Sequence, residues 1–154
     1  MTVRFFEDFQ VGDEVTSRGQ TITESSIIDY ATQYDPQYFH TDVEAAAGSP
    51  YGGLIASGWQ TVAIGFRLFI DTNQIGENSL GSPGCDELRW LKPVRPGDTL
   101  HTVARILELR PSSSRPDRGT IVTSFRMINQ RGEDVLTLKG SLLVKRRPNP
   151  VSVA

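Results

Sequence analysis

The sequence predicts an α+β domain in which a curved antiparallel sheet wraps around one long helix. Residues 57–70 are apolar on almost every helical face, and from residue 84 onward the hydrophobic period changes to two. Turn sequences at 96–98 and 129–132 are of the kind that join antiparallel neighbours. A buried helix and an alternating sheet are expected to cover each other's apolar faces.

Length and charge limit the classes of function. The 154 residues suffice for one domain, which we expect over residues 1–147, followed by a C-terminal tail at 148–154. A net charge of −2 gives no general attraction for nucleic acid or anionic membranes. Residues 89–154 nevertheless contain thirteen Lys or Arg and five Asp or Glu, so this half could supply a phosphate site. Neutralisation of the acidic first half is the simpler explanation.

The chain carries no sign of export or of a metal cluster. Cys85 is the only cysteine, which excludes a disulfide framework and indicates a reducing compartment. The first ten residues lack the basic and apolar stretches of a signal peptide, and Arg67 interrupts the longest apolar run. We therefore expect a cytoplasmic protein without a membrane span.

The first elements are two weak extended segments and a helix. Residues 14–17 and 20–23 are expected to be extended around a glycine. Thr23 is a plausible N-cap for the helix that follows. This helix should end near Asp35, because Pro36 disfavours the α conformation of the residue before it.

A short second helix is expected over residues 43–47. Either Thr41 or Asp42 can cap its N-terminus, and Gly48 with Pro50 forms its stop signal.

The long helix is expected to begin near Ser57. Because its apolar residues occupy almost every face, we expect the rest of the protein to enclose it. Gly65 in its middle costs about 1 kcal/mol of helix propensity relative to alanine. Its presence suggests that another group passes close by. The predicted strands then follow at 87–91, 100–109, 120–128 and 135–145, with a mobile loop at 111–117.

The densest cluster of reactive side chains lies at residues 34–42, between the first two helices. Asp35 and His40 are five positions apart, with Pro36 restraining the chain, so both can reach one small volume. A carboxylate and an imidazole so placed can perform general acid–base catalysis. A turn-forming Asp and a structural His would give the same pattern.

The start of the long helix supplies a second candidate feature. Its first amides have no intrahelical acceptor, and Gly58 lets a ligand approach the backbone, so the Gly58 amide could bind an oxyanion. A plain N-cap is the simpler explanation of Ser57.

Four segments together, at 23–31, 35–42, 51–58 and 88–98, resemble the MaoC-like dehydratases, the (R)-specific enoyl-CoA hydratase family. The resemblance covers most of residues 5–145. It implies the hot-dog fold, in which the curved sheet wraps the central helix and short helices in an overhanging segment carry the active site.

The family motif D-x-N-P-x-H places its two reactive groups on Asp35 and His40. The resemblance implies reversible hydration of a trans-2-enoyl thioester to an (R)-3-hydroxyacyl thioester, with Asp35 as general base and His40 as general acid. It implies the Gly58 amide as oxyanion donor, and no metal or cofactor beyond the coenzyme A of the acyl-CoA substrate.

Three positions depart from the family pattern. Gln37 stands where the motif has Asn, Ser57 stands where the family usually has His before the glycine, and Ala63 stands where some members have an active-site Ser. These changes bear on substrate choice and rate.

The residues expected to bind substrate are Gln37, Tyr51, Ser57, Arg89 and Lys92, with Arg95, Arg110, Arg115 and Arg118 as further phosphate candidates. Each of these cations is more simply explained as a solvated surface charge.

Two alternatives remain open. A hot-dog thioesterase commonly carries a carboxylate on the central helix, but residues 58–70 contain no Asp or Glu. A non-catalytic acyl-CoA-binding subunit would not need both Asp35 and His40. Because a single wrapped sheet leaves an edge open, we expect at least a homodimer.

Overall fold

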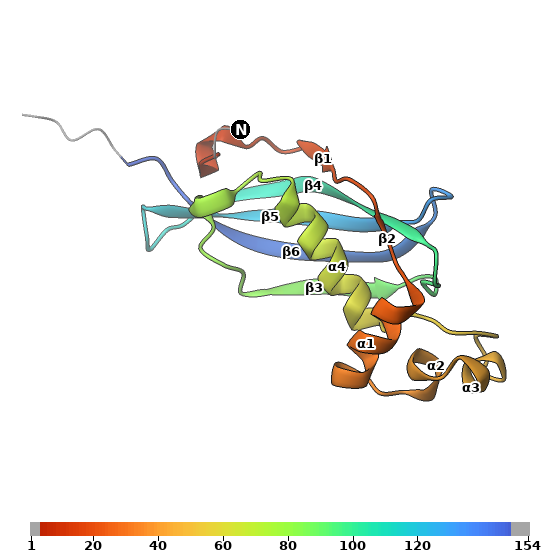
Figure 1. Cartoon of the computed structure of the whole chain (residues 1–154). Coiled ribbons are helices and arrows are strands. Elements are labelled where there is room, and N and C mark those ends of the chain that lie inside the picture. The colour runs from red at the N-terminus through yellow and green to blue at the C-terminus, as the bar shows by residue number, and fades with distance from the viewer. Residues whose placement is uncertain (1–3, 149–154) are drawn as a thin grey trace, which may run out of the picture.

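The computed structural model of the chain describes residues 4–148. An antiparallel sheet is ordered β1-β4-β5-β6-β3, with β2 also paired to β4 (Figure 1). The strands are β1 (Glu14–Thr16), β2 (Gln20–Thr21), β3 (Gly84–Trp90), β4 (Thr99–Pro111), β5 (Arg118–Ile128) and β6 (Asp134–Lys145). The α+β prediction is confirmed. The strands predicted from residue 84 onward all lie within observed strands, except that the one predicted at 87–91 extends one residue beyond β3.

The two weak extended segments do not pair with each other. Both β1 and β2 pair with β4, at Glu14 opposite Arg105 and at Gln20 opposite Leu100. Between them, a Cβ on Gly19 would lie 2.8 Å from the His101 ring, so the chain crosses too close to β4 there for a side chain. The N-terminal segment therefore forms one interrupted edge.

The helices are α1 (Glu24–Tyr34), α2 (Tyr38–Thr41), α3 (Val43–Ala47) and α4 (Gly58–Asp71), with 3-10 turns at Phe6–Asp8 and Gly76–Asn78. The predicted caps are confirmed: Thr23 accepts a hydrogen bond from Ser26 N, Asp42 from Ala45 N, and Ser57 from Trp59 N. The sequence did not predict α2, because four residues are too few to show a helical period.

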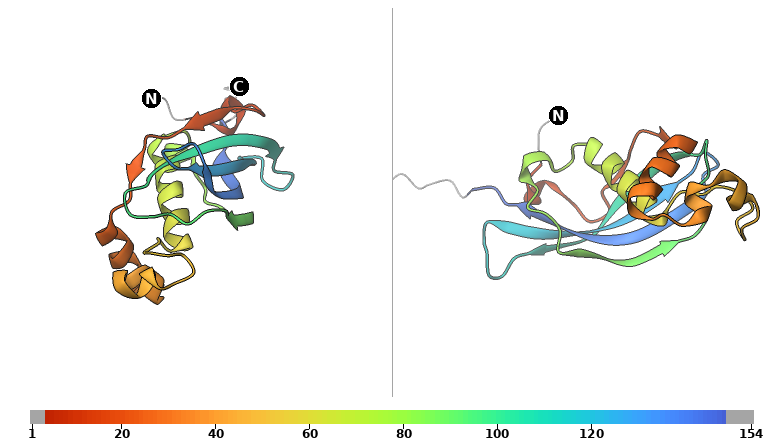
Figure 2. Two further views of the ribbon diagram at one scale, coloured as in Figure 1. Left: turned by 90° about the vertical axis from the view of Figure 1, so that its right-hand side faces the viewer. Right: turned by 60° about the horizontal axis from the view of Figure 1, so that its bottom comes forward.

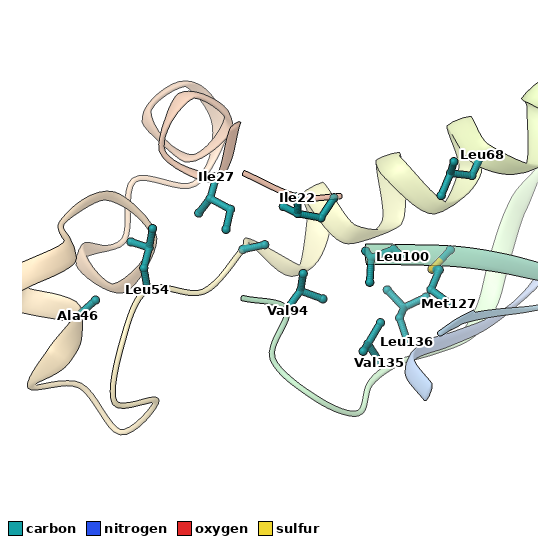
Figure 3. Packing of buried hydrophobic residues seen from close by; sticks show 11 residues of the cluster. Ile22, Ile27, Ala46, Leu54, Leu68, Val94, Leu100, Met127, Val135 and Leu136 are labelled. Carbon is teal, nitrogen blue, oxygen red and sulfur yellow. The ribbon is translucent and has the colours of Figure 1, made fainter. Parts of the chain in front are cut away.

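Helix α4 packs across the concave face of the sheet. Leu68 on α4 faces Leu100, Met127 and Leu136 on three strands (Figure 3). Gly65 marks the closest approach, because a Cβ there would lie 2.0 Å from the Met127 methyl carbon. The Gly65 carbonyl also accepts a hydrogen bond from Thr102 Oγ1 at 2.8 Å. The glycine at position 65 therefore allows α4 to pack closely on β5, as its low helix propensity suggested.

The expected full enclosure of α4 is wrong for the single chain. Trp59, Phe66 and Ile70 are 57%, 45% and 48% exposed. The sheet therefore covers only part of the surface of α4. Strand β3, whose second edge has no partner within residues 4–148, is exposed at six of its seven positions. An apolar surface therefore remains open on one chain.

Two further expectations concern a membrane span and the C-terminal tail. No helix within the described residues is both long and apolar enough to cross a membrane. The proposed tail at 148–154 lies outside the described residues except for its first position.

Candidate active site

Helices α1, α2 and α3 gather at one end of α4, beyond the sheet (Figures 1 and 2). Asp35 caps the C-terminus of α1, where its amide donates to the Ala31 carbonyl at 2.9 Å. Pro36 then ends the helix, and the chain re-enters helical structure at α2, which carries His40. This arrangement turns both side chains toward the N-terminus of α4.

The His40 ring is buried and held in one orientation. Its Nδ1 lies 2.7 Å from the Ile55 carbonyl oxygen. A carbonyl only accepts, so Nδ1 carries a proton and Nε2 is the nitrogen that faces Asp35. Nε2 lies 3.4 Å from Asp35 Oδ2, and the Phe39 ring packs edge-on against the imidazole. The predicted convergence of Asp35 and His40 is therefore observed.

Two side chains donate to the Asp35 carboxylate. Gln37 Nε2 donates to Oδ1 at 2.7 Å, and Ser57 Oγ donates to Oδ2 at 2.6 Å. Burial acts to raise the pKa of Asp35, but these hydrogen bonds and the nearby His40 outweigh it and lower the pKa below its usual value. The site thus favours the ionised carboxylate.

Asp35 and His40 open onto a cleft of about 490 Å³ between the overhanging helices, the start of α4 and the end of β3. Its walls combine the acid–base pair with aromatic and aliphatic groups. The lining residues include Gln37, Phe39, Tyr51, Gly58, Trp59, Thr61, Trp90, Lys92, Val94 and Val135. A cleft that combines apolar walls with a few convergent polar groups is typical of a small-molecule site.

Gly58 is required for the packing of Trp90 at the start of α4. A Cβ on this residue would lie 2.3 Å from Trp90 Nε1, so the indole of Trp90 covers the Cβ side of the glycine. Trp90 in turn meets Trp59 edge-to-face, with ring centroids 5.4 Å apart. The two indoles form an aromatic wall beside the first turn of α4.

The predicted substrate-binding residues are only partly brought together. Gln37, Tyr51 and Lys92 line the cleft, whereas Arg89 does not. Ser57 is fully buried beneath the cleft and contacts Asp35 instead. Lys92 is ion-paired with Glu133.

Most further phosphate candidates have acceptors elsewhere. Arg95 donates to the Tyr51 carbonyl at 2.5 Å, while Arg110 pairs with Glu108 and Arg118 with Asp117. None of these arginines, nor Arg115, is among the residues that line the cleft. Within residues 4–148, no group of three or more His, Cys, Asp or Glu is placed to hold a metal ion.

Sequence reasoning missed the contacts made by distant segments. Nothing in the sequence indicated that Trp90 packs on Gly58, or that the Ile55 carbonyl orients His40. An aromatic residue at the end of an edge strand was the only available signal for Trp90.

The family profile of the MaoC like domain matches residues 8–123, which is most of the chain. The chain belongs to the MaoC-like dehydratase family. A crystal structure of the MaoC-like dehydratase from Rhodospirillum rubrum is 40% identical, covers 95% of this chain and 99% of its own, and superposes with a TM-score of 0.86. The MaoC-like assignment and the predicted hot-dog fold are thus confirmed.

Two curated relatives align with more than nine-tenths of this chain. The uncharacterized protein YdeM of Bacillus subtilis is 31% identical over 140 residues, covering 91% of this chain and 98% of that protein. Mesaconyl-CoA hydratase of Cereibacter sphaeroides is 29% identical over 146 residues, covering 94% of this chain. This MaoC-like chain spans 42% of that hydratase's length.

Proposed function

We propose that this chain adds water reversibly to a trans-2-enoyl-CoA to give an (R)-3-hydroxyacyl-CoA. The observation that carries the proposal is the 3.4 Å approach of Asp35 Oδ2 to His40 Nε2 at the wall of an open cleft. Asp35 acts as general base and His40 as general acid. The hydratase relative acts on a thioester of this class by name, which supports the choice of substrate.

The reaction balances when it starts from an ionised Asp35 and a doubly protonated His40. A water between the groups adds its oxygen to C3 while Asp35 takes one of its protons. His40 Nε2–H gives a proton to C2, since Nδ1–H remains bound to Ile55. The proton on Asp35 then returns to His40 across the same 3.4 Å contact, which restores the starting state.

Charge that develops on the thioester oxygen is met by the start of α4. Gly58 lines the cleft, and its amide, at the first position of α4, has no intrahelical acceptor. A preorganised donor of this kind can lower a barrier by about 3 kcal/mol. Lys92, which lines the cleft, can exchange its contact with Glu133 for a phosphate of coenzyme A.

The apolar side of α4 favours a homodimer. Trp59, Phe66 and Ile70 are exposed there, and β3 has an open edge within residues 4–148. A second copy can cover the apolar surface and pair with the strand. Because Trp59 also lines the cleft, the dimer contact lies beside the acid–base pair.

The proposal is tested by hydration of crotonyl-CoA and of a branched dicarboxylic enoyl-CoA. We expect wild type to hydrate at least one of them, and Asp35→Asn and His40→Gln to lose about 100-fold or more in kcat/KM. Thr102→Val is the control, because the Thr102 hydroxyl donates to the Gly65 carbonyl in the middle of α4 and Thr102 does not line the cleft.

Three results would overturn the hydratase assignment. Release of free coenzyme A without hydration would indicate a thioesterase. Binding of acyl-CoA without turnover would indicate a binding subunit, and full activity of Asp35→Asn would remove the acid–base role.

A further inference from the structure

N-capping alone does not explain the burial of Ser57 or its contact with Asp35. It has no exposed surface and does not line the cleft. Its Oγ accepts from Trp59 N at 3.3 Å, as an N-cap does, and also lies 2.6 Å from Asp35 Oδ2. The second contact is short and joins α4 to the end of α1.

The direction of this hydrogen bond follows from the chemistry of its partners. The amide of Trp59 only donates, so Ser57 Oγ accepts there and its single proton is free for another acceptor. An ionised carboxylate only accepts, so Ser57 donates to Asp35. Gln37 holds Oδ1 from the opposite side at 2.7 Å. With one donor on each oxygen, the carboxylate cannot rotate freely.

The same contact determines which oxygen meets the imidazole. Oδ2, the oxygen that Ser57 holds, is also the one that lies 3.4 Å from His40 Nε2. A carboxylate oxygen has two lone pairs, so Oδ2 can accept from Ser57 and still take a proton from the cleft side. Rotation of Asp35 would break this shared geometry.

We propose that Ser57 is a positioning residue whose buried hydroxyl donates to Asp35 Oδ2 and holds this oxygen toward His40. The proposal rests on the proposed hydratase function for its catalytic consequence. It replaces the expectation that Ser57 binds substrate directly.

The proposal predicts a specific pH effect. A hydrogen bond donated to a carboxylate stabilises the charged form, so removing the Ser57 donor raises the pKa of Asp35. Because catalysis needs ionised Asp35, the acidic limb of kcat/KM should move to higher pH by about one unit. A residue that only supports the fold would lower activity equally at all pH values.

The test compares wild type with Ser57→Ala and Ser57→Cys. Cysteine keeps a side-chain atom in the place of Oγ but donates weakly, so it serves where alanine disturbs folding. Two quantities are measured in the full chain: the ¹³C-carboxyl titration midpoint of Asp35 without substrate, and the pH profile of kcat/KM. Thr102→Val is the matched control, since it removes another buried hydroxyl that contacts α4, 2.8 Å from the Gly65 carbonyl.

We expect the Asp35 midpoint to rise in Ser57→Ala by about one pH unit and in Ser57→Cys by less, with the control unchanged. An unchanged midpoint in both Ser57 variants would overturn the proposal, even if activity falls. If wild type hydrates no enoyl-CoA, the hydratase assignment fails, whereas the titration still decides whether Ser57 holds the carboxylate.

Discussion

His40 Nδ1 is hydrogen-bonded to the backbone carbonyl of Ile55 at 2.7 Å, fifteen residues along the chain. This bond joins α2 to the segment before α4 and fixes which imidazole nitrogen faces Asp35. A ring without this partner could flip and present either nitrogen. The acid–base geometry therefore depends on a backbone atom as much as on the two side chains.

The bond to Ile55 separates structural from chemical roles of His40. In His40→Asn, the side-chain amide can take the place of Nδ1 and keep the bond to Ile55, but no group replaces Nε2. We expect the variant to unfold at a urea concentration close to that of wild type, while hydration falls about 100-fold or more. In His40→Gln the bond to Ile55 is lost, so stability should fall as well. Equal stability loss in both variants would contradict this role for Ile55.

The contact between Gly58 and Trp90 predicts a coupled pair of mutations. In Gly58→Ala, the new methyl group meets indole atoms at 2.3–2.9 Å, so Trp90 must move. We expect a loss of about 1–3 kcal/mol in the free energy of unfolding and a changed near-UV signal from the Trp59–Trp90 pair. In Gly58→Ala/Trp90→Ala the clash is absent, so the two effects should not add. Strict additivity in urea unfolding would mean that the two residues do not contact each other.

Local signals predicted the elements, and distant contacts determined the site. Thr23 and Ser57 were identified as caps because capping involves atoms within three residues. The strands followed from their two-residue period. The packing of Trp90 on Gly58 and of Met127 on Gly65 joins segments more than thirty residues apart. No pattern within one segment specifies such pairs.

The sequence predicted that Asp35 and His40 converge, but it did not predict all of the contacts around them. The spacing of Asp35 and His40, with the family resemblance, placed both side chains correctly. Gln37 was expected to replace an orienting Asn, and it does hold Asp35. Ser57 could be recognised as a helix cap, but its bond to Asp35 depends on how α1 meets α4. The sequence therefore did not predict that Ser57 donates to the Asp35 carboxylate.

The open side of α4 predicts a mutation that separates the chains of a dimer. In Phe66→Asp, a charge replaces a ring that is 45% exposed in the single chain and that a second copy would bury. Burial of an unpaired charge is costly, so we expect the variant to sediment as a monomer where wild type sediments as a dimer. Val11→Asp is the control, because Val11 is 63% exposed and lies outside α4 and β3. If wild type and Phe66→Asp have the same mass in solution, this face is not the contact between copies.

Glu133 predicts how stability depends on pH. Hydrogen bonds from Asn129, Lys92 and Arg131 lower the pKa of Glu133 from 4.5 to about 2. Because the folded-state pKa lies below the unfolded value, the carboxylate stabilises the fold in full above pH 4.5, and this contribution is lost as the pH falls toward about 2.

Replacing this carboxylate should therefore matter most near neutral pH. We expect Glu133→Gln to lower the free energy of unfolding at about pH 7, and the difference from wild type to shrink steadily between pH 4.5 and about 2. Urea unfolding at several pH values measures this difference. Glu77→Gln is the control, since Glu77 is an exposed carboxylate for which the described residues provide no ion pair. A difference between Glu133→Gln and wild type that stays constant across this pH range would show that the ion pairs of Glu133 do not contribute to folding.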